Sequence, residues 1–363
     1  MEANITTFLD LERGARNLLQ QCARAVPGER LLLVGERCDR PFFDPTLCSI
    51  IERVAASLGI SSETVLAPPA SDAANISPAV INAMKQVDVT IFFSRLGDQL
   101  RFSDVGGANR RVMTYTLTRE HLGSKFATTN YSEMRKLQEA LLNAIQNTSS
   151  YRIESENGTN LTARIPSVKT TDTAVFTDFA LDLFPVMIFP PITFFDLEGC
   201  LVLEHFLLSS STHSYDSSVF ILDTPVTVRV KNSRMISFEG DHALIDKLEN
   251  QLERAASITG GDPFCLNSWH TGINPFTFYD GDPYADLERW GTVAYGSPRY
   301  THIHAAGNNP GDISIQLFDA TISFDGKLYW KDGRFLFFDQ PELHAITDRS
   351  QSPDSWTNLS IGF

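Results

Sequence analysis

The chain lacks paired cysteines and long hydrophobic runs, and each absence excludes a class of protein. Its five cysteines are scattered, odd in number and form no CxxC pair, which argues against a disulfide framework or a zinc knot. No apolar run approaches the length of a membrane span. The first 25 residues lack the layout of a signal peptide. We therefore expect a cytoplasmic protein with reduced thiols and no membrane attachment.

Basic residues are in the minority. The 363 residues include 44 Asp and Glu against 30 Lys and Arg, which gives a formal net charge of −14. Such a surface repels phosphate backbones, so no nucleic-acid partner is expected. Hydrophobic residues at 42% supply enough apolar material for a core. A chain of this length exceeds one ordinary domain, so we expect two.

Two common catalytic signatures are also absent. The apolar run Leu31–Val34 ends at Gly35, but the following residues do not form the GxGxxG loop of dinucleotide-binding domains. No GxSxG nucleophile motif occurs. A nucleotide-dependent enzyme that uses the first half of the chain is kept as a third alternative.

The two halves of the chain differ in their patterns. Short apolar runs predict strands at 31–35, 64–66, 87–93 and 111–115, with helical patterns between them. This alternation predicts a parallel-sheet α/β domain over residues 1–150. From residue 151 the alternating pattern of half-buried strands dominates, with an Asn-Gly hairpin turn near the start and one amphipathic helix at about 242–256. The second domain, 151–363, is therefore predicted to be mostly antiparallel α+β.

Three histidines mark a candidate site in the second half. His270 is predicted to lie in a turn rich in Gly, Asn and Pro. His302 and His304 alternate in one strand and so project from the same face. Together with Asp312 they make a set of three imidazoles and one carboxylate, which could hold zinc or iron. The same residues could also serve as hydrogen-bonding groups without a metal. The residues that we predict to line a ligand-binding cleft are Trp269, His270, Asn274, Tyr300, His302, His304, Asn308, Asn309 and Asp312.

Several segments resemble the fold shared by the M29 aminopeptidases (aminopeptidase T) and the 2,5-dihydroxypyridine dioxygenases. The hairpin 157–162 resembles that family's Gly-Thr-Asp-Leu segment, and Trp269–Pro275 resembles its His-x-Gly-x-x-Asn-Pro loop. Thr321–Lys327 resembles its closing hairpin. The resemblance implies a metal-dependent enzyme, often a dimer, in which the loop histidine and a later His-x-Asp pair hold the metal. His270 matches the loop histidine.

The other ligands that the resemblance implies are replaced. Counting back from Asp325-Gly326, the His-x-Asp pair falls on Asp312-Ile313-Ser314, so aspartate replaces the histidine and serine replaces the aspartate. The family's glutamates after a Phe-Pro and after the loop glycine are absent as well. A two-metal peptidase needs several anionic ligands, and a mononuclear iron dioxygenase needs two histidines and a carboxylate. These departures imply that the family's usual metal chemistry is lost.

Two hypotheses follow. The first is a catalytically degenerate relative, without a cofactor, that binds a peptide or a small carboxylate and presents it to other enzymes, as in peptide natural-product biosynthesis; a homodimer is expected from the resemblance. The alternative is a metal-dependent hydrolase or ring-cleaving dioxygenase with zinc or iron on a rearranged set of His270, His302, His304 and Asp312. Whether the chain is an enzyme therefore depends on whether it holds a metal.

Overall fold

The chain folds into two compact units. The computed structural model describes residues 7–37, 39, 42–103, 105–106, 109–166, 175–213, 218–340, 343 and 358–363. Unit 1 comprises Met1–Arg135, Phe179–Met187 and Ser211–Ser214, and unit 2 comprises Lys136–Asp178, Ile188–Ser210 and Tyr215–Phe363. The helix α7 (Tyr131–Gln146) carries the chain from unit 1 into unit 2.

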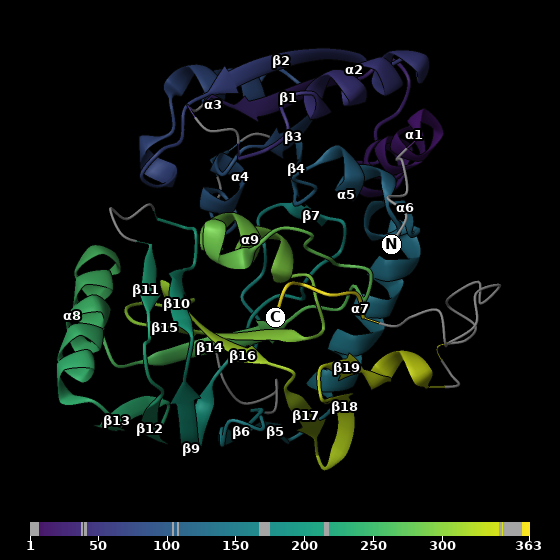
Figure 1. The fold of residues 1–363 in the computed structure, drawn as a ribbon. Coiled ribbons are helices and arrows are strands. Elements are labelled where there is room, and N and C mark those ends of the chain that lie inside the picture. The colour runs from purple at the N-terminus through teal and green to yellow at the C-terminus, as the bar shows by residue number, and fades with distance from the viewer. Residues whose placement is uncertain are drawn as a thin grey trace. The chain divides into compact units, whose positions relative to one another are not determined.

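Unit 1 is built on a five-stranded sheet in which every pair of neighbours is parallel (Figure 1). The order is β2-β1-β3-β4-β7. Its strands are β1 (Arg30–Glu36), β2 (Ser61–Ala67), β3 (Val89–Phe93), β4 (Arg110–Thr114) and β7 (Asp182–Phe184). Every residue of β3 is buried, so both faces of this strand are covered.

Unit 1 also contains short α-helices. They are α1 (Phe8–Arg16), α2 (Leu47–Ser57), α3 (Pro78–Met84), α4 (Leu96–Gln99), α5 (Arg119–Gly123) and α6 (Lys125–Thr128). Thr7 caps α1, because its side chain accepts a hydrogen bond from the Asp10 N–H and the Asp10 side chain accepts one from the Thr7 N–H. After Arg16 the helix widens into a π-helical segment, Asn17–Cys22.

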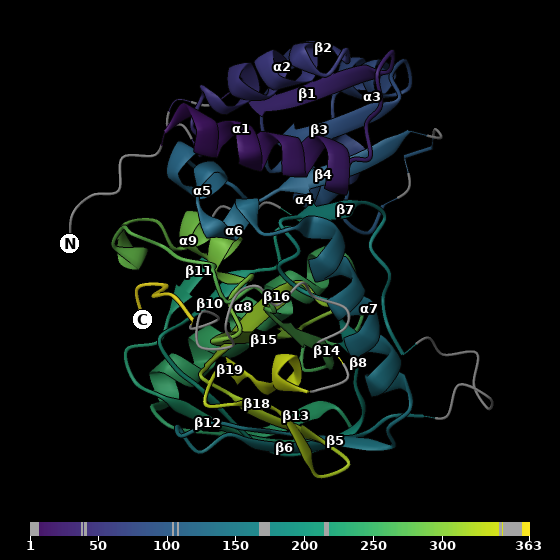
Figure 2. The ribbon, with the colours of Figure 1, turned by 90° about the vertical axis from the view of Figure 1, so that its right-hand side faces the viewer.

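Unit 2 contains two antiparallel sheets, which lie one above the other in both views (Figures 1 and 2). The eight-stranded sheet has the order β13-β12-β9-β6-β5-β17-β18-β19. Its strands are β5 (Ser150–Glu154), β6 (Asn160–Arg164), β9 (Phe195–Leu203), β12 (Val226–Lys231), β13 (Arg234–Glu239), β17 (Thr321–Phe324), β18 (Lys327–Lys331) and β19 (Arg334–Phe335).

The six-stranded sheet of unit 2 has the order β11-β10-β16-β15-β14-β8. Its strands are β8 (Ile192–Thr193), β10 (Phe206–Ser209), β11 (Val219–Ile221), β14 (Leu266–Thr271), β15 (Tyr300–Ala305) and β16 (Ile313–Phe318). Every residue of β14 and β15 is buried, so both faces of this sheet are covered. The helices of unit 2 besides α7 are α8 (His242–Thr259) and α9 (Leu287–Ala294).

One face of the six-stranded sheet packs against the eight-stranded sheet. Trp269 of β14 is fully buried, with its ring centroid 5.3 Å from that of Tyr151 on β5 and 6.3 Å from that of Phe324 on β17. β5 and β6 alternate between buried and exposed residues, so only one face of the eight-stranded sheet joins this core. The opposite face of the six-stranded sheet carries the histidines.

The fold class predicted from the sequence is confirmed: a parallel sheet with helices in the first unit and antiparallel sheets in the second. The sequence patterns missed α9 and the strand β7, which lies far along the chain from its neighbours in the parallel sheet. The helical spacing of residues 9–26 predicts one continuous α-helix, and this prediction is wrong, because the α-helix ends at Arg16 and Asn17–Cys22 is π-helical. Among the described residues, no helix is long and apolar enough to cross a membrane.

Candidate metal centre

The register of β14 and β15 brings three histidines to one face of the sheet. His270 lies directly opposite His302, and His304 lies two residues further along β15. Residues that are opposite one another across an antiparallel pair, or two apart on one strand, project to the same side. All three side chains are buried, with exposed fractions of 0%, 2% and 1%.

The ring nitrogens of these histidines converge. One nitrogen from each of His270, His302 and His304 lies within 4.8 Å of the other two. The Nε2 atoms of His270 and His304 are 3.2 Å apart. A zinc ion binds each histidine nitrogen at about 2.0–2.1 Å. With the N–Zn–N angles of octahedral or tetrahedral coordination, two such nitrogens lie about 3 Å from one another. The His270 and His304 nitrogens therefore have the spacing of two ligands of one divalent ion.

A backbone carbonyl determines which nitrogen of His270 faces its partners. The Nδ1 atom of His270 lies 2.8 Å from the carbonyl oxygen of Phe189. A carbonyl can only accept, so Nδ1 carries the proton and donates, which leaves the Nε2 lone pair directed toward His304. Histidines that bind metals commonly donate their other ring N–H in this way.

The chain turns closely at the end of β14. A Cβ atom on Gly272 would lie 2.2 Å from the carbonyl carbon of Gly296 and 2.3 Å from the carbonyl oxygen of Ser297. The Asn274 N–H donates to the Gly296 oxygen at 3.0 Å, and the Asn274 side-chain oxygen accepts from the Phe276 N–H at 3.0 Å. These contacts bring the segment after His270 against the segment that leads into β15.

Helix α9 and the residue after it lie over the histidine face. The ring centroid of Tyr295 is 4.5 Å from that of His302, and the centroid of Trp290 is 5.2 Å from that of Tyr300. The Trp290 Nε1–H donates to the Ile361 carbonyl at 2.6 Å. The aromatic cover explains why the histidines are shielded from solvent within their own unit.

A row of buried polar side chains lies beside the histidines. In the register of β15 and β16, Gln316 is opposite His302 and Ser314 is opposite His304. Tyr300 lies two residues before His302 on the same face, and burial is the largest cause that raises the pKa of its hydroxyl well above the ordinary value. Hydrogen bonding with the Gln316 and Ser314 side chains lowers the pKa of this hydroxyl in turn, so the three groups are partners of one another.

Asp312 lies one residue before β16, next in the alternating series with Ser314 and Gln316. It is 1% exposed, and its Oδ1 accepts a hydrogen bond of 2.9 Å from the Ser210 hydroxyl. Its backbone N–H donates to the Ala305 carbonyl at 2.9 Å. Among the described residues, the cluster of converging ligand atoms consists of the three histidines without this carboxylate.

The remaining predicted cleft residues have structural contacts. Trp269 faces the core between the two sheets, on the side away from the histidines. Asn308 and Asn309 are exposed, and their side-chain amides donate to the Thr259 carbonyl at 3.1 Å and to the Thr177 hydroxyl at 3.1 Å. These bonds connect the turn before β16 to the end of α8 and to the segment that contains Thr177.

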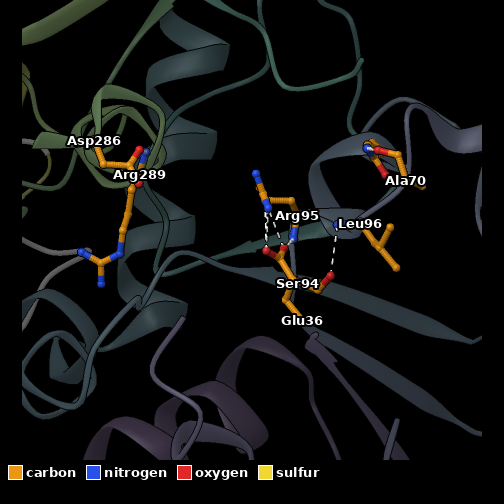
Figure 3. A network of polar contacts seen from close by, with 8 residues as sticks. Glu36, Ala70, Ser94, Arg95, Leu96, Asp286 and Arg289 are labelled. Carbon is orange, nitrogen blue, oxygen red and sulfur yellow. Dashed lines mark hydrogen bonds and ion pairs between the residues drawn. The ribbon is translucent and has the colours of Figure 1, made fainter. Parts of the chain in front are cut away.

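Unit 1 offers the place where sheets of this strand order commonly bind cofactors. The order reverses between β1 and β3, and ligands of such folds bind beyond the carboxyl ends of the strands at this point. Here Glu36, which ends β1, accepts hydrogen bonds from the Arg95 backbone N–H at 2.9 Å and from its Nη2 at 2.8 Å (Figure 3). The Glu36 side chain is 1% exposed. A buried carboxylate in this position disfavours a bound phosphate, which argues against the nucleotide-dependent alternative.

No family model and no curated protein sequence matches this chain. Solved structures similar to it include 2,5-dihydroxypyridine dioxygenase from Pseudomonas putida KT2440, with 12% identity, a TM-score of 0.60 and coverage of 91% of this chain and 97% of that chain. Wild-type AmpT from Thermus thermophilus is 9% identical, with a TM-score of 0.49 and coverage of 90% and 99%. The likeness to the dioxygenase confirms the fold relationship that the sequence segments indicated. At this identity it shows the fold alone.

The sequence indicated part of this site and missed part. The sequence grouped His270 with His302 and His304, whose alternation predicted a shared face. The structure places His270 within the strand β14, opposite His302, and not in the turn where it was expected. In the sequence, Ser314 stood out only as the residue that replaces a metal ligand. Because it lies two residues before Gln316, strand alternation would have predicted that both polar side chains project to the same face. The Phe189 carbonyl had no sequence signal, because any residue supplies one.

Proposed function

We propose that this chain is an enzyme that holds one divalent metal ion on His270, His302 and His304. The observation that carries the proposal is the convergence of three ring nitrogens within 4.8 Å on one buried sheet face. The hydrogen bond from His270 Nδ1 to the Phe189 carbonyl supports it, because it orients Nε2 as a ligand before any ion arrives.

The ligand set favours hydrolysis over ring cleavage. Three neutral imidazoles match a known catalytic zinc set, whereas mononuclear iron oxygenases use two histidines and a carboxylate. The carboxylate of Asp312 accepts a hydrogen bond from Ser210 and is not part of the converging cluster. When bound, such an ion supplies a Lewis acid and an acidified water molecule. The buried strands hold the ligands, and the aromatic cover of α9 limits the access of bulk water.

The test is metal content with matched variants. We expect close to one equivalent of zinc or iron per chain in protein purified without chelators, and loss of that metal in His270→Ala, His302→Ala and His304→Ala. His242→Ala is the control, because His242 is an exposed residue at the start of α8. Thermal unfolding of each variant shows whether metal loss reflects the missing ligand or a failure to fold.

Metal at background level, together with no heat of binding on titration with zinc, iron or manganese, would overturn this proposal. The three histidines would then be a hydrogen-bonded core cluster. Peptide presentation and a homodimer stay predictions from the resemblance, and the cytoplasmic location stays a prediction from the cysteine pattern and the N-terminal sequence. Binding of peptides by metal-free protein, with no hydrolysis when metal is restored, would favour that hypothesis over the enzyme.

A further inference from the structure

The histidines of the metal centre are supported in different ways. The Phe189 carbonyl accepts from His270 Nδ1, and the rings of these two residues meet at an interplanar angle of 77°, which is an edge contact. His302 instead has the ring of Tyr295 against it, with the two centroids 4.5 Å apart and the planes tilted by 36°. This distance is at the short end of the range of about 4.5–7 Å that aromatic pairs occupy, and the lower angle turns the two ring faces toward one another.

A face contact this close restricts the imidazole. Rotation of the His302 side chain would turn an edge of its ring toward the face of Tyr295. Carbon atoms touch at about 3.5–4.0 Å, so a centroid separation of 4.5 Å leaves no space for an edge with its hydrogen atoms. We propose that Tyr295 is a positioning residue of the metal centre, whose ring face keeps the His302 imidazole turned so that one ring nitrogen meets those of His270 and His304. This inference rests on the proposed metal centre.

The Tyr295 ring is itself held in place. Its side chain is 6% exposed, and its backbone N–H donates to the Gly291 carbonyl of α9 at 3.1 Å. The carbonyl of the next residue, Gly296, accepts from the Asn274 N–H at 3.0 Å. Asn274 lies four residues after His270, so the position of Tyr295 is fixed relative to the strands of both histidines.

The electron distribution of the ring adds to this effect. The face of an aromatic ring carries the negative side of its quadrupole and attracts a cation, most strongly where water is excluded. An imidazole that binds a divalent ion takes on part of the positive charge, and both His302 and Tyr295 are buried. The Tyr295 face therefore stabilises the metal-bound form of His302. Phenylalanine offers the same face, whereas an aliphatic side chain does not.

The test uses cobalt, because the visible absorption of bound cobalt responds to the arrangement of its ligands without any knowledge of the reaction. Competition with a coloured chelator measures the affinity. We expect Tyr295→Met to weaken cobalt binding about tenfold, which corresponds to about 1.4 kcal/mol, and to shift the absorption band. Tyr295→Phe, which keeps the ring face, is expected to retain the affinity and the band of the unaltered protein.

Tyr329→Met is the matched control. Tyr329 is 5% exposed and its ring lies 5.2 Å from that of Phe337, but it belongs to β18 of the eight-stranded sheet. We expect both methionine variants to lower the unfolding temperature of the metal-free protein, and only Tyr295→Met to change cobalt binding. Tyr295→Leu takes its place in the same comparison if Tyr295→Met fails to fold.

Two results would overturn the positioning role and leave the metal centre standing. One is an affinity and an absorption band in Tyr295→Met that equal those of the unaltered protein. The other is a loss in Tyr295→Phe as large as that in Tyr295→Met, because the hydroxyl and not the ring face would then be responsible. Failure of the unaltered protein to bind cobalt would overturn the metal centre, and the role of Tyr295 with it.

Discussion

The tight approach at Gly272 gives a sharp test of the geometry around the histidines. In Gly272→Ala the new methyl group would lie 2.2 Å from the Gly296 carbonyl carbon, 2.3 Å from the Gly296 oxygen and 2.3 Å from the Ser297 oxygen. All three are backbone atoms, so no side-chain rotation relieves the contact. The two segments must separate by about 1 Å to reach ordinary van der Waals distances.

The size of the effect follows from two opposing terms. Replacing glycine by alanine reduces the freedom of the unfolded chain and stabilises a protein by about 0.4–1 kcal/mol where the site accepts it. Overpacking of this kind costs about 1–3 kcal/mol and sometimes more, so the clash exceeds the gain. For a unit of this size we expect the unfolding temperature to fall by several degrees, about 2–4 °C for each kcal/mol. Metal affinity should fall too, since Gly272 joins the His270 strand to the segment before β15.

Gly291→Ala is the matched control for this experiment. Its methyl group would approach the Leu208 Cδ1 atom to 2.9 Å, which is the end of a flexible side chain, and would lie at ordinary contact distance, 3.8 Å, from the Tyr295 ring and hydroxyl. Gly291 lies within α9, where alanine is favoured over glycine by about 1 kcal/mol. We expect little change in stability, measured by circular dichroism during heating. A Gly272→Ala protein as stable as Gly291→Ala, with unchanged metal affinity, would refute the reasoning.

Three further outcomes are expected. Trp269→Ala should lower the free energy of unfolding by about 3–5 kcal/mol in urea titrations, because the indole is fully buried between the sheets; a loss below 1 kcal/mol would contradict that placement. Cys22 and Cys48 should react with a thiol reagent only after unfolding, since burial raises the pKa of the Cys48 thiol to about 12 and that of Cys22 further; peptide mapping of labelled native protein checks this. Hydrogen bonds from Arg234 lower the pKa of Asp262. These bonds therefore stabilise the folded protein fully above the ordinary carboxyl pKa, and this stabilisation is lost as the pH falls through the lowered pKa. Both side chains are substantially exposed, so Asp262→Asn should change the acid side of the stability profile by less than about 1 kcal/mol.

The features that the sequence predicted well are those set by local pattern. The apolar run Leu31–Val34 predicted the buried strand β1 of unit 1, because a strand covered on both faces has no polar alternation. The alternation of His302 and His304 predicted their shared face for the equivalent reason.

The features that the sequence did not predict depend on contacts between distant segments. The pairing of His270 with His302 depends on strand register, which a sequence without its turn geometry leaves open. The Phe189 carbonyl reaches His270 from a separate segment of the chain. Asp312 and Ser314 stand where the resemblance implies metal ligands of another kind, and this suggested that no metal is bound. His302 and His304 of β15 offer ring nitrogens instead, at positions that the resemblance did not include.

The central claim is that three buried histidines share one metal ion, and anomalous X-ray scattering from crystals of protein grown with zinc and iron tests it most directly. The account predicts one strong peak per chain, about 2.0–2.2 Å from Nε2 of His270 and from one ring nitrogen each of His302 and His304. No peak at the three rings after soaking in either metal, with His270 and His304 hydrogen-bonded to one another instead, would contradict it.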